Sequence, residues 1–205
     1  MRDVIRRWRS RPPMRVPSDP GNVSAVTVRY LLYVLLPAWF VPGVADWLMH
    51  RRTRIEETTG LRESGIHSLM MGEIPVPVTL VLLCEVNAPL LALCAAAGLA
   101  HEATAIWDVR TAVEGHREVR PAEQHIHSFL ESLPFMAIST LLCLHWDEVA
   151  CRDGDFWARP LRLRRRRLPG RYLAEVFAAV AAFVVAPYGE EALRCLRSRG
   201  NPPRA

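Results

Sequence analysis

The chain has 205 residues, half of them hydrophobic, and carries a formal net charge of +5 at pH 7. This length accommodates one domain or at most two. The basic residues accompany no nucleic-acid recognition motif, which argues against a nucleic-acid-binding protein, and the five cysteines form no pair spaced for redox exchange.

The hydrophobic residues gather in five runs instead of spreading evenly. Most of these runs approach the roughly 20 residues that a helix needs to cross a bilayer. They cover residues 26–49, 66–86, 88–107, 128–146 and 172–187. The pattern predicts an all-α, polytopic integral membrane bundle of four to five spans, because the last run is short enough to lie on the membrane surface instead. A soluble helical protein with unusually apolar core helices is the alternative.

Charge and proline divide the chain into three parts. We expect a disordered Arg/Pro-rich arm at residues 1–23, a transmembrane helical domain at 24–190 and a basic tail at 191–205. The arm lacks the apolar core of a secretory signal, so we expect the first run to remain as an uncleaved span. The expected extramembrane loops within the helical domain are 51–64, 110–121 and 147–171.

The first span ends in Asp46 and His50, and the helix after the first loop carries Glu63 and His67 into the second span. The members of each pair are four positions apart. Residues four apart lie on the same face of an α-helix. Each of these two helix ends should therefore present one carboxylate and one imidazole together.

The turn between the second and third spans is marked by Glu85, Asn87 and Pro89, since one helix across both runs would be far longer than a bilayer requires. The third span then runs back and delivers His101 and Asp108. These two residues are seven positions apart, which again places them on one helical face.

Pro121 is well placed at the first turn of the next helix, which continues as the fourth span. This helix carries Glu123 and His127 four positions apart. His125 points roughly 200° away from His127, so both are not expected to bind one ion. We favour His127, and His125 would replace it if the helix began later than expected.

These four groups lie at the end of span one, the start of span two, the end of span three and the start of span four. An alternating topology therefore brings all of them to one side of the membrane. Such a set suits a two-metal centre better than a structural zinc site, which typically has four Cys or His ligands. The predicted metal ligands are Asp46, His50, Glu63, His67, His101, Asp108, Glu123 and His127, and the next candidates, for a catalytic role, are Glu102 and His125.

Other chemistries find less support in the sequence. No phosphate-binding loop with lysine and no strand–turn–helix context for a serine nucleophile is present. His101-Glu102 begins like a zinc-protease helix, but position 105 is Ala where that motif needs a second histidine. Haem held by two imidazoles remains an alternative, although it leaves the carboxylates without a role.

In the style of its site, the region from about Asp46 to His127 resembles the membrane-bound histidine-box di-iron enzymes, the fatty-acid hydroxylases and desaturases. Asp46–His50 and Glu63–His67 resemble a first box in which a carboxylate replaces one histidine, whereas the paired adjacent histidines of the later boxes are absent and only 125–127 comes near. The resemblance implies two metal ions, taken as iron with zinc as the alternative. It also implies oxidoreductase activity on a lipid or other hydrophobic substrate, with an electron donor as partner.

Two further functions stay open. One is a zinc-dependent membrane lipid hydrolase, similar to ceramidase-type proteins in placing His and Asp at one face, where the metal would activate water. The other is a non-catalytic metal- or haem-binding membrane protein. The loops on the side of the N-terminus hold slightly more arginine, which predicts a cytoplasmic N-terminus and an outward-facing metal site in a bacterial inner membrane. The histidine-box resemblance implies the opposite orientation.

Overall fold

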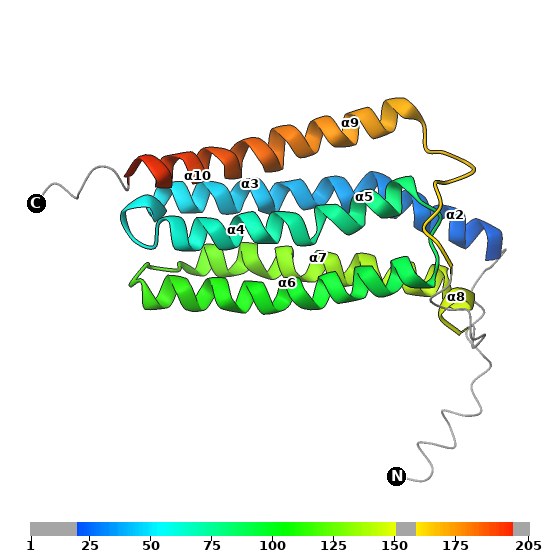
Figure 1. Cartoon of the computed structure of the whole chain (residues 1–205), viewed down its shortest axis with the longest axis horizontal. Coiled ribbons are helices and arrows are strands. Elements are labelled where there is room, and N and C mark those ends of the chain that lie inside the picture. The colour runs from blue at the N-terminus through cyan, green and yellow to red at the C-terminus, as the bar shows by residue number, and fades with distance from the viewer. Residues whose placement is uncertain (1–19, 151–158, 199–205) are drawn as a thin grey trace, which may run out of the picture.

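The computed structural model describes residues 20–150 and 159–198, and helices make up all of the regular structure in this part of the chain. In chain order the elements are α2 (Pro20–Tyr30), η1 (Leu31–Leu35), α3 (Leu36–Arg52), η2 (Ile55–Glu57), α4 (Leu61–Glu73), α5 (Pro75–Leu83), α6 (Ala88–Glu114), α7 (Pro121–Leu144), α8 (Trp146–Ala150), α9 (Gly170–Val180), η4 (Ala181–Val185) and α10 (Ala186–Ser198). The long helices run side by side along the longest axis of the molecule (Figure 1). The predicted all-α bundle is confirmed.

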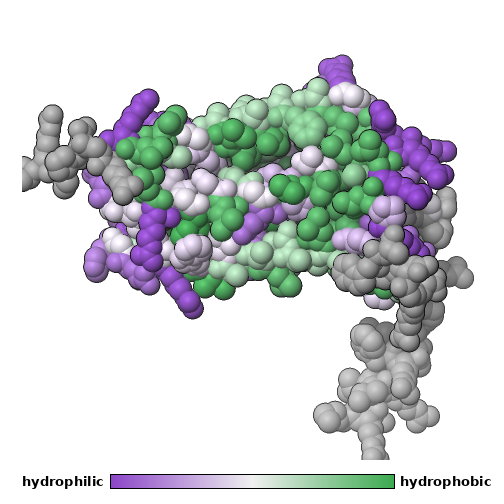
Figure 2. Space-filling model, in the orientation of Figure 1, coloured by the Kyte–Doolittle hydropathy of each residue, from purple (hydrophilic) through white to green (hydrophobic). Residues whose placement is uncertain are grey.

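Five helical segments are long and apolar enough to cross a membrane. They are Gly21–Arg52, Leu61–Leu83, Ala88–Glu114, Pro121–Leu144 and Gly170–Ser198. In the first and fourth of these segments, only 11% of the most apolar stretch of 18 residues is buried inside the protein. Most of the apolar side chains in these stretches therefore face outward. Figure 2 shows hydrophobic residues along the middle of the molecule and hydrophilic residues at its two ends. This distribution is that of an integral membrane protein, whose apolar belt contacts lipid.

Helix boundaries follow local signals in the sequence. Pro121 occupies the first turn of α7, as predicted, where its missing N–H leaves no hydrogen bond unmade. Asn87 caps α6 by accepting a hydrogen bond from the backbone N–H of Leu90 at 3.1 Å. Gly98 lies where α6 meets α7, and a Cβ there would lie 2.7 Å from the side chain of Ile138. A glycine at this position therefore permits the close approach of two helices that carry site residues.

Three of the expected segments have other bounds in the structure. Residues 191–198, expected in the basic tail, belong to α10, because this helix does not end with the apolar run. Residues 20–23 already belong to α2, while the rest of the expected arm lies outside the described residues. The expected loop 147–171 includes part of the short helix α8, and its residues 151–158 also lie outside the described part.

The ends of the helices that carry the predicted ligands meet at one end of the bundle. The connections α3–α4 and α6–α7 and the end of α10 all lie at the left of Figure 1, and the α5–α6 turn lies at the opposite end. α4 packs against α6, α3 packs against α7, and α10 packs against both α3 and α4. The alternating topology inferred from the apolar runs is therefore present, and it adds α10 to the site.

Candidate metal centre

Seven of the eight predicted ligands come together at this end of the bundle, and six of them form two overlapping groups. The first group contains Asp46, His50, Glu123 and His127, whose potential ligand atoms all lie within 4.8 Å of one another. His127 Nε2 is 2.8 Å from Asp46 Oδ1, and His50 Nε2 is 3.5 Å from the same oxygen. His50 Nε2 is also 3.8 Å from Glu123 Oε1. Helices α3 and α7 thus contribute one carboxylate and one imidazole each.

The second group contains His50, Glu63 and His67, again with ligand atoms within 4.8 Å of one another. The rings of His50 and His67 stack in parallel, with centroids 4.4 Å apart and an interplanar angle of 3°. Asp108 Oδ1 lies 3.1 Å from His67 Nε2 and adds a carboxylate from α6. Because His50 belongs to both groups, the arrangement offers two adjacent positions for cations.

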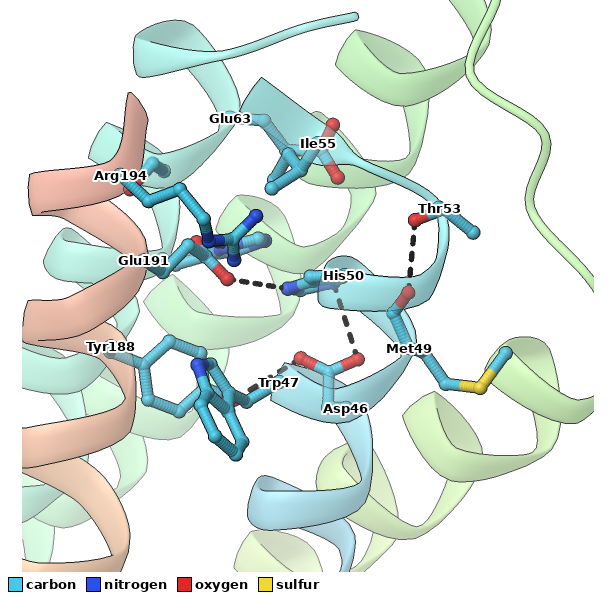
Figure 3. A network of polar contacts seen from close by, with 12 residues as sticks. Asp46, Trp47, Met49, His50, Thr53, Ile55, Glu63, Tyr188, Glu191 and Arg194 are labelled. Carbon is cyan, nitrogen blue, oxygen red and sulfur yellow. Dashed lines mark hydrogen bonds and ion pairs between the residues drawn. The ribbon is translucent and has the colours of Figure 1, made fainter. Parts of the chain in front are cut away.

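Glu191 on α10 connects the two stacked imidazoles. Its Oε2 lies 2.9 Å from His50 Nδ1, its Oε1 lies 2.7 Å from His67 Nδ1, and all three side chains are buried. A carboxylate can only accept these hydrogen bonds, so both rings carry a proton on Nδ1, and in its neutral form each ring presents the Nε2 lone pair to the site. A carboxylate behind a histidine is the usual support of a metal ligand. Figure 3 shows His50 held between Glu191 and Asp46.

Tyr188, one turn before Glu191 on α10, also reaches the centre. Its hydroxyl donates to Asp46 Oδ2 at 3.1 Å, or to the carbonyl oxygen of Gly43 at 3.2 Å. Tyr188 and Glu191 were not among the sequence candidates. A signal was nevertheless present, since they are three positions apart on one helical face and follow a fifth run whose end lies on the side of the predicted site.

The donor set leaves several buried polar atoms without a hydrogen-bond partner, which is rare in folded proteins unless a bound group satisfies them. Among the described residues, the buried atoms at this end that make no hydrogen bond include His50 Nε2, His67 Nε2, Asp108 Oδ1 and Glu123 Oε2. Glu63 Oε1 and Glu123 Oε1 make no hydrogen bond either, but each forms an ion pair with Arg117. An imidazole lone pair that faces a carboxylate is repelled unless a proton or a cation lies between them. Imidazole nitrogens and carboxylate oxygens are ligands of divalent transition metals, so the residues present fit such ions.

The charge balance of the buried side chains supports the same interpretation. Five carboxylates are buried here, and Arg117 is the one buried guanidinium among the described residues. The carboxylates belong to Asp46, Glu63, Asp108, Glu123 and Glu191. With neutral imidazoles, four negative charges remain uncompensated. Buried charges persist when they are paired or when they bind metals, and two divalent cations would balance this excess.

Arg117 lies in the loop between α6 and α7, yet its side chain points into the centre and is only 4% exposed. Its Nη1 is 2.7 Å from Glu123 Oε1, its Nη2 is 2.5 Å from Glu63 Oε1, and its Nε donates to Glu63 Oε2 at 3.0 Å. Burial by itself lowers the pKa of Arg117, but the two carboxylates outweigh it and hold the pKa above its ordinary value. Arg117 therefore stays charged and holds two candidate ligands in place.

Replacing Arg117 with alanine should destabilise the metal-free protein by about 3 kcal/mol, because removal of one partner leaves buried carboxylates uncompensated. Denaturant unfolding of chelator-treated protein in detergent micelles measures this change. Arg120→Ala is the matched control, since Arg120 is exposed and lies 3.5 Å from the exposed Glu118. Arg120→Ala should change the free energy of unfolding by no more than about 0.5 kcal/mol. Equal stability of the two variants would contradict the structural role of Arg117.

Three sequence candidates lie apart from the two groups. His101 is buried on α6 but faces Glu73, with its Nδ1 3.4 Å from Glu73 Oε2. Glu102 is partly buried and belongs to neither group. His125 is exposed on α7, where its ring packs edge-on against Phe129 with centroids 5.2 Å apart. In this arrangement His127 is the α7 histidine at the centre, as the helical spacing favoured.

An apolar cavity of about 140 Å³ adjoins the centre. Its polar wall includes Asp46, His67, Asp108 and His127. The rest of the wall is mainly hydrophobic and includes Trp39, Phe40, Met70, Val78, Leu82 and Val180. A hydrophobic molecule in this cavity would contact the candidate ligands directly.

No protein-family model matches the chain, and the curated proteins and solved structures that were searched contain no match either. The resemblance to histidine-box enzymes thus rests on the pattern of side chains alone.

Proposed function

We propose that this protein is a di-metal membrane oxidoreductase, similar in its chemistry to hydroxylases and desaturases, that acts on a lipid or another hydrophobic substrate. The observation that carries the proposal is the buried set of five carboxylates and one arginine, with two imidazole Nε2 atoms left unpartnered. A membrane-embedded cluster of this kind is costly unless it serves a function. Two divalent ions would satisfy both its charge and its unpartnered atoms.

The competing account of the charge is that protons on the imidazoles balance the carboxylates. His127 Nε2 to Asp46 at 2.8 Å and His67 Nε2 to Asp108 at 3.1 Å are short enough for such ion pairs. Protonation gives no reason for the unpartnered Oε2 of Glu123, nor for the two overlapping groups around His50. These features favour metal ions.

Iron is the preferred metal because mixed carboxylate and imidazole ligation by facing helices is typical of di-iron helical bundles. Two ferrous ions held here would supply the activation of O₂ and the oxidation of a C–H bond. The protein itself contributes three further functions to this chemistry. Glu191 orients the imidazoles, Arg117 holds Glu63 and Glu123, and the apolar cavity beside His67 excludes water and admits a hydrocarbon. An electron donor is required as a partner.

The test is to load purified metal-free protein with ferrous iron under anaerobic conditions and then expose it to O₂. We expect it to bind about two ions per chain and to consume O₂. Glu123→Ala should abolish this consumption, because Glu123 is fully buried and lies 3.8 Å from His50 Nε2. Glu118→Ala is the control, since Glu118 is exposed in the neighbouring loop.

The same experiment separates the alternative functions. A zinc hydrolase, in which the metal activates water, would give three results. The protein would be isolated with zinc, it would consume no O₂ after iron loading, and it would cleave an ester- or amide-linked lipid. Protein that binds metal or haem stoichiometrically but shows neither activity would be a non-catalytic metal- or haem-binding membrane protein. Either result would contradict the oxidoreductase proposal.

A further inference from the structure

A second and larger cavity lies toward the opposite end of the bundle. Its volume is about 620 Å³, within the range of about 300–1,000 Å³ that is typical of small-molecule sites. Most of its wall is aliphatic and includes Leu31, Leu35, Pro77, Val81, Ala137 and Leu141. The cavity is therefore suited to a hydrocarbon chain.

Basic side chains lie at one end of this second cavity. Arg164, Arg165 and Arg166 all line it, together with His145 and one acidic residue, Glu85. Burial lowers the pKa of His145, and the nearby positive charge of Arg164 lowers it further. His145 is therefore neutral near pH 7, and the positive charge at this end comes from the three arginines, which outnumber the one carboxylate.

Arg164 and Arg165 are only partly engaged by other protein groups. Arg164 Nη2 donates to the carbonyl oxygen of Val81 at 2.8 Å, but its Nε is buried and has no hydrogen-bond partner among the described residues. Arg165 Nε is 3.9 Å from Glu85 Oε1, at the limit of an ion pair. Basic pockets between transmembrane helices bind the anionic head groups of lipids. An anionic group here would satisfy Arg164 and offset the excess charge.

The second cavity borders the one beside the metal centre. Five residues line both: Leu36, Trp39, Ile74, Val78 and Leu82. The backbone N–H of Arg164 donates to the carbonyl oxygen of Leu83, the last residue of α5. From His67 to Leu83 the helices α4 and α5 rise by about 24 Å at 1.5 Å per residue. A molecule anchored at the arginines therefore has an apolar path toward the metal centre.

We propose that the second cavity binds a single-chain anionic amphiphile of the long-chain fatty-acid type, with its carboxylate at Arg164–Arg166 and its chain directed toward the metal centre. A single cavity of about 620 Å³ with one basic end favours a single chain over a two-chain phospholipid. Bidentate hydrogen bonds from guanidinium to carboxylate supply the recognition of the head. Oxidation of such a molecule at the metal centre would then occur far from its carboxylate.

Binding can be measured on metal-free protein in a neutral detergent, so the result does not depend on the proposed oxidoreductase function. The probe is palmitate brominated near its methyl end, which quenches the fluorescence of nearby tryptophan. Trp39 lies on the wall that both cavities share and should be quenched. Trp39→Phe should remove this component. Palmitate brominated beside the carboxyl group should quench Trp39 less, and the opposite order would overturn the proposed orientation.

The arginine variants test the recognition of the head. Replacing Arg164, Arg165 and Arg166 together with glutamine should weaken palmitate binding by about tenfold or more. Arg171→Gln is the matched control, because Arg171 is exposed, does not line the cavity and pairs with Glu175 at 2.9 Å. Its affinity for palmitate should equal that of the unaltered protein. Equal binding by the triple variant would overturn the proposal.

Two further ligands and one further variant complete the test. Palmityl alcohol has the same chain without the charge. It should bind the unaltered protein no more tightly than palmitate binds the triple variant. If brominated phosphatidylglycerol binds more tightly than palmitate, the ligand of the cavity is an acidic phospholipid, and the single-chain proposal is overturned. Ala137→Phe fills the cavity wall while leaving the arginines in place, and it should also weaken palmitate binding. Far-ultraviolet circular dichroism identifies any variant that fails to fold.

Discussion

His67→Ala should reduce the metal content of the purified protein from about two ions to one or none, whereas His101→Ala should leave it unchanged. His67 belongs to the group that surrounds His50 and faces Asp108 at 3.1 Å. His101 instead faces Glu73 at 3.4 Å and lies outside both candidate groups. Elemental analysis of protein purified in detergent measures the difference.

The control for this comparison is His145→Ala, which alters a partly buried histidine at the opposite end of the bundle. It should retain the full metal content. Equal loss in the His67 and His101 variants would mean that both histidines are ligands, contrary to the geometry described above. Full retention in all three variants would remove the proposed metal centre.

Glu191→Gln should lower the affinity for metal by about 10- to 100-fold, the usual effect of altering a group that supports a metal-bound histidine. The amide has one accepting oxygen, so it can accept a hydrogen bond from only one of His50 Nδ1 and His67 Nδ1. Its NH₂ group would face the other ring and force the proton of that ring onto Nε2. The corresponding lone pair would then be unavailable to a metal. A metal titration followed by competition with a chelator measures the change.

Glu190→Gln is the matched control because Glu190 precedes Glu191 and undergoes the same chemical change. Its carboxylate accepts a hydrogen bond from Trp47 Nε1 at 2.9 Å and is partly exposed. Its metal affinity should stay close to that of the unaltered protein. If the two variants bound metal equally well, Glu191 would not be the residue that orients the imidazoles.

Much of the fold and a large part of the candidate site follow from short-range regularities. Apolar runs near the length of a bilayer predict spans, and alternation of these spans determines which loops share a side. Pairs four positions apart, such as Asp46–His50 and Glu63–His67, share a helical face whatever lies around them. These pairs and Glu123–His127 reach the centre as the sequence predicts. The sequence thus predicted that these pairs come together before their packing was known.

His101 and Asp108 show where this reasoning ends. They share a face of α6, but seven residues separate them by about 10 Å along the helix axis. Only Asp108 reaches the centre, while His101 meets Glu73 near the end of α4. A face defines a direction around a helix, and the axial position of each neighbour decides which residue on that face makes the contact.

The roles of Arg117 and Glu191 were decided by the tertiary structure alone. In the sequence Arg117 is one charge in a charged loop, and Glu191 lies at the start of an expected basic tail. The loop turns inward so that Arg117 pairs with Glu63 and Glu123, and α10 continues past the apolar run so that Glu191 reaches His50 and His67. The sequence alone determined which helix ends carry the candidate ligands, because helical periodicity and span length are local properties. Which charges are buried against them depends on contacts between segments distant in the chain, which only the packed structure defines.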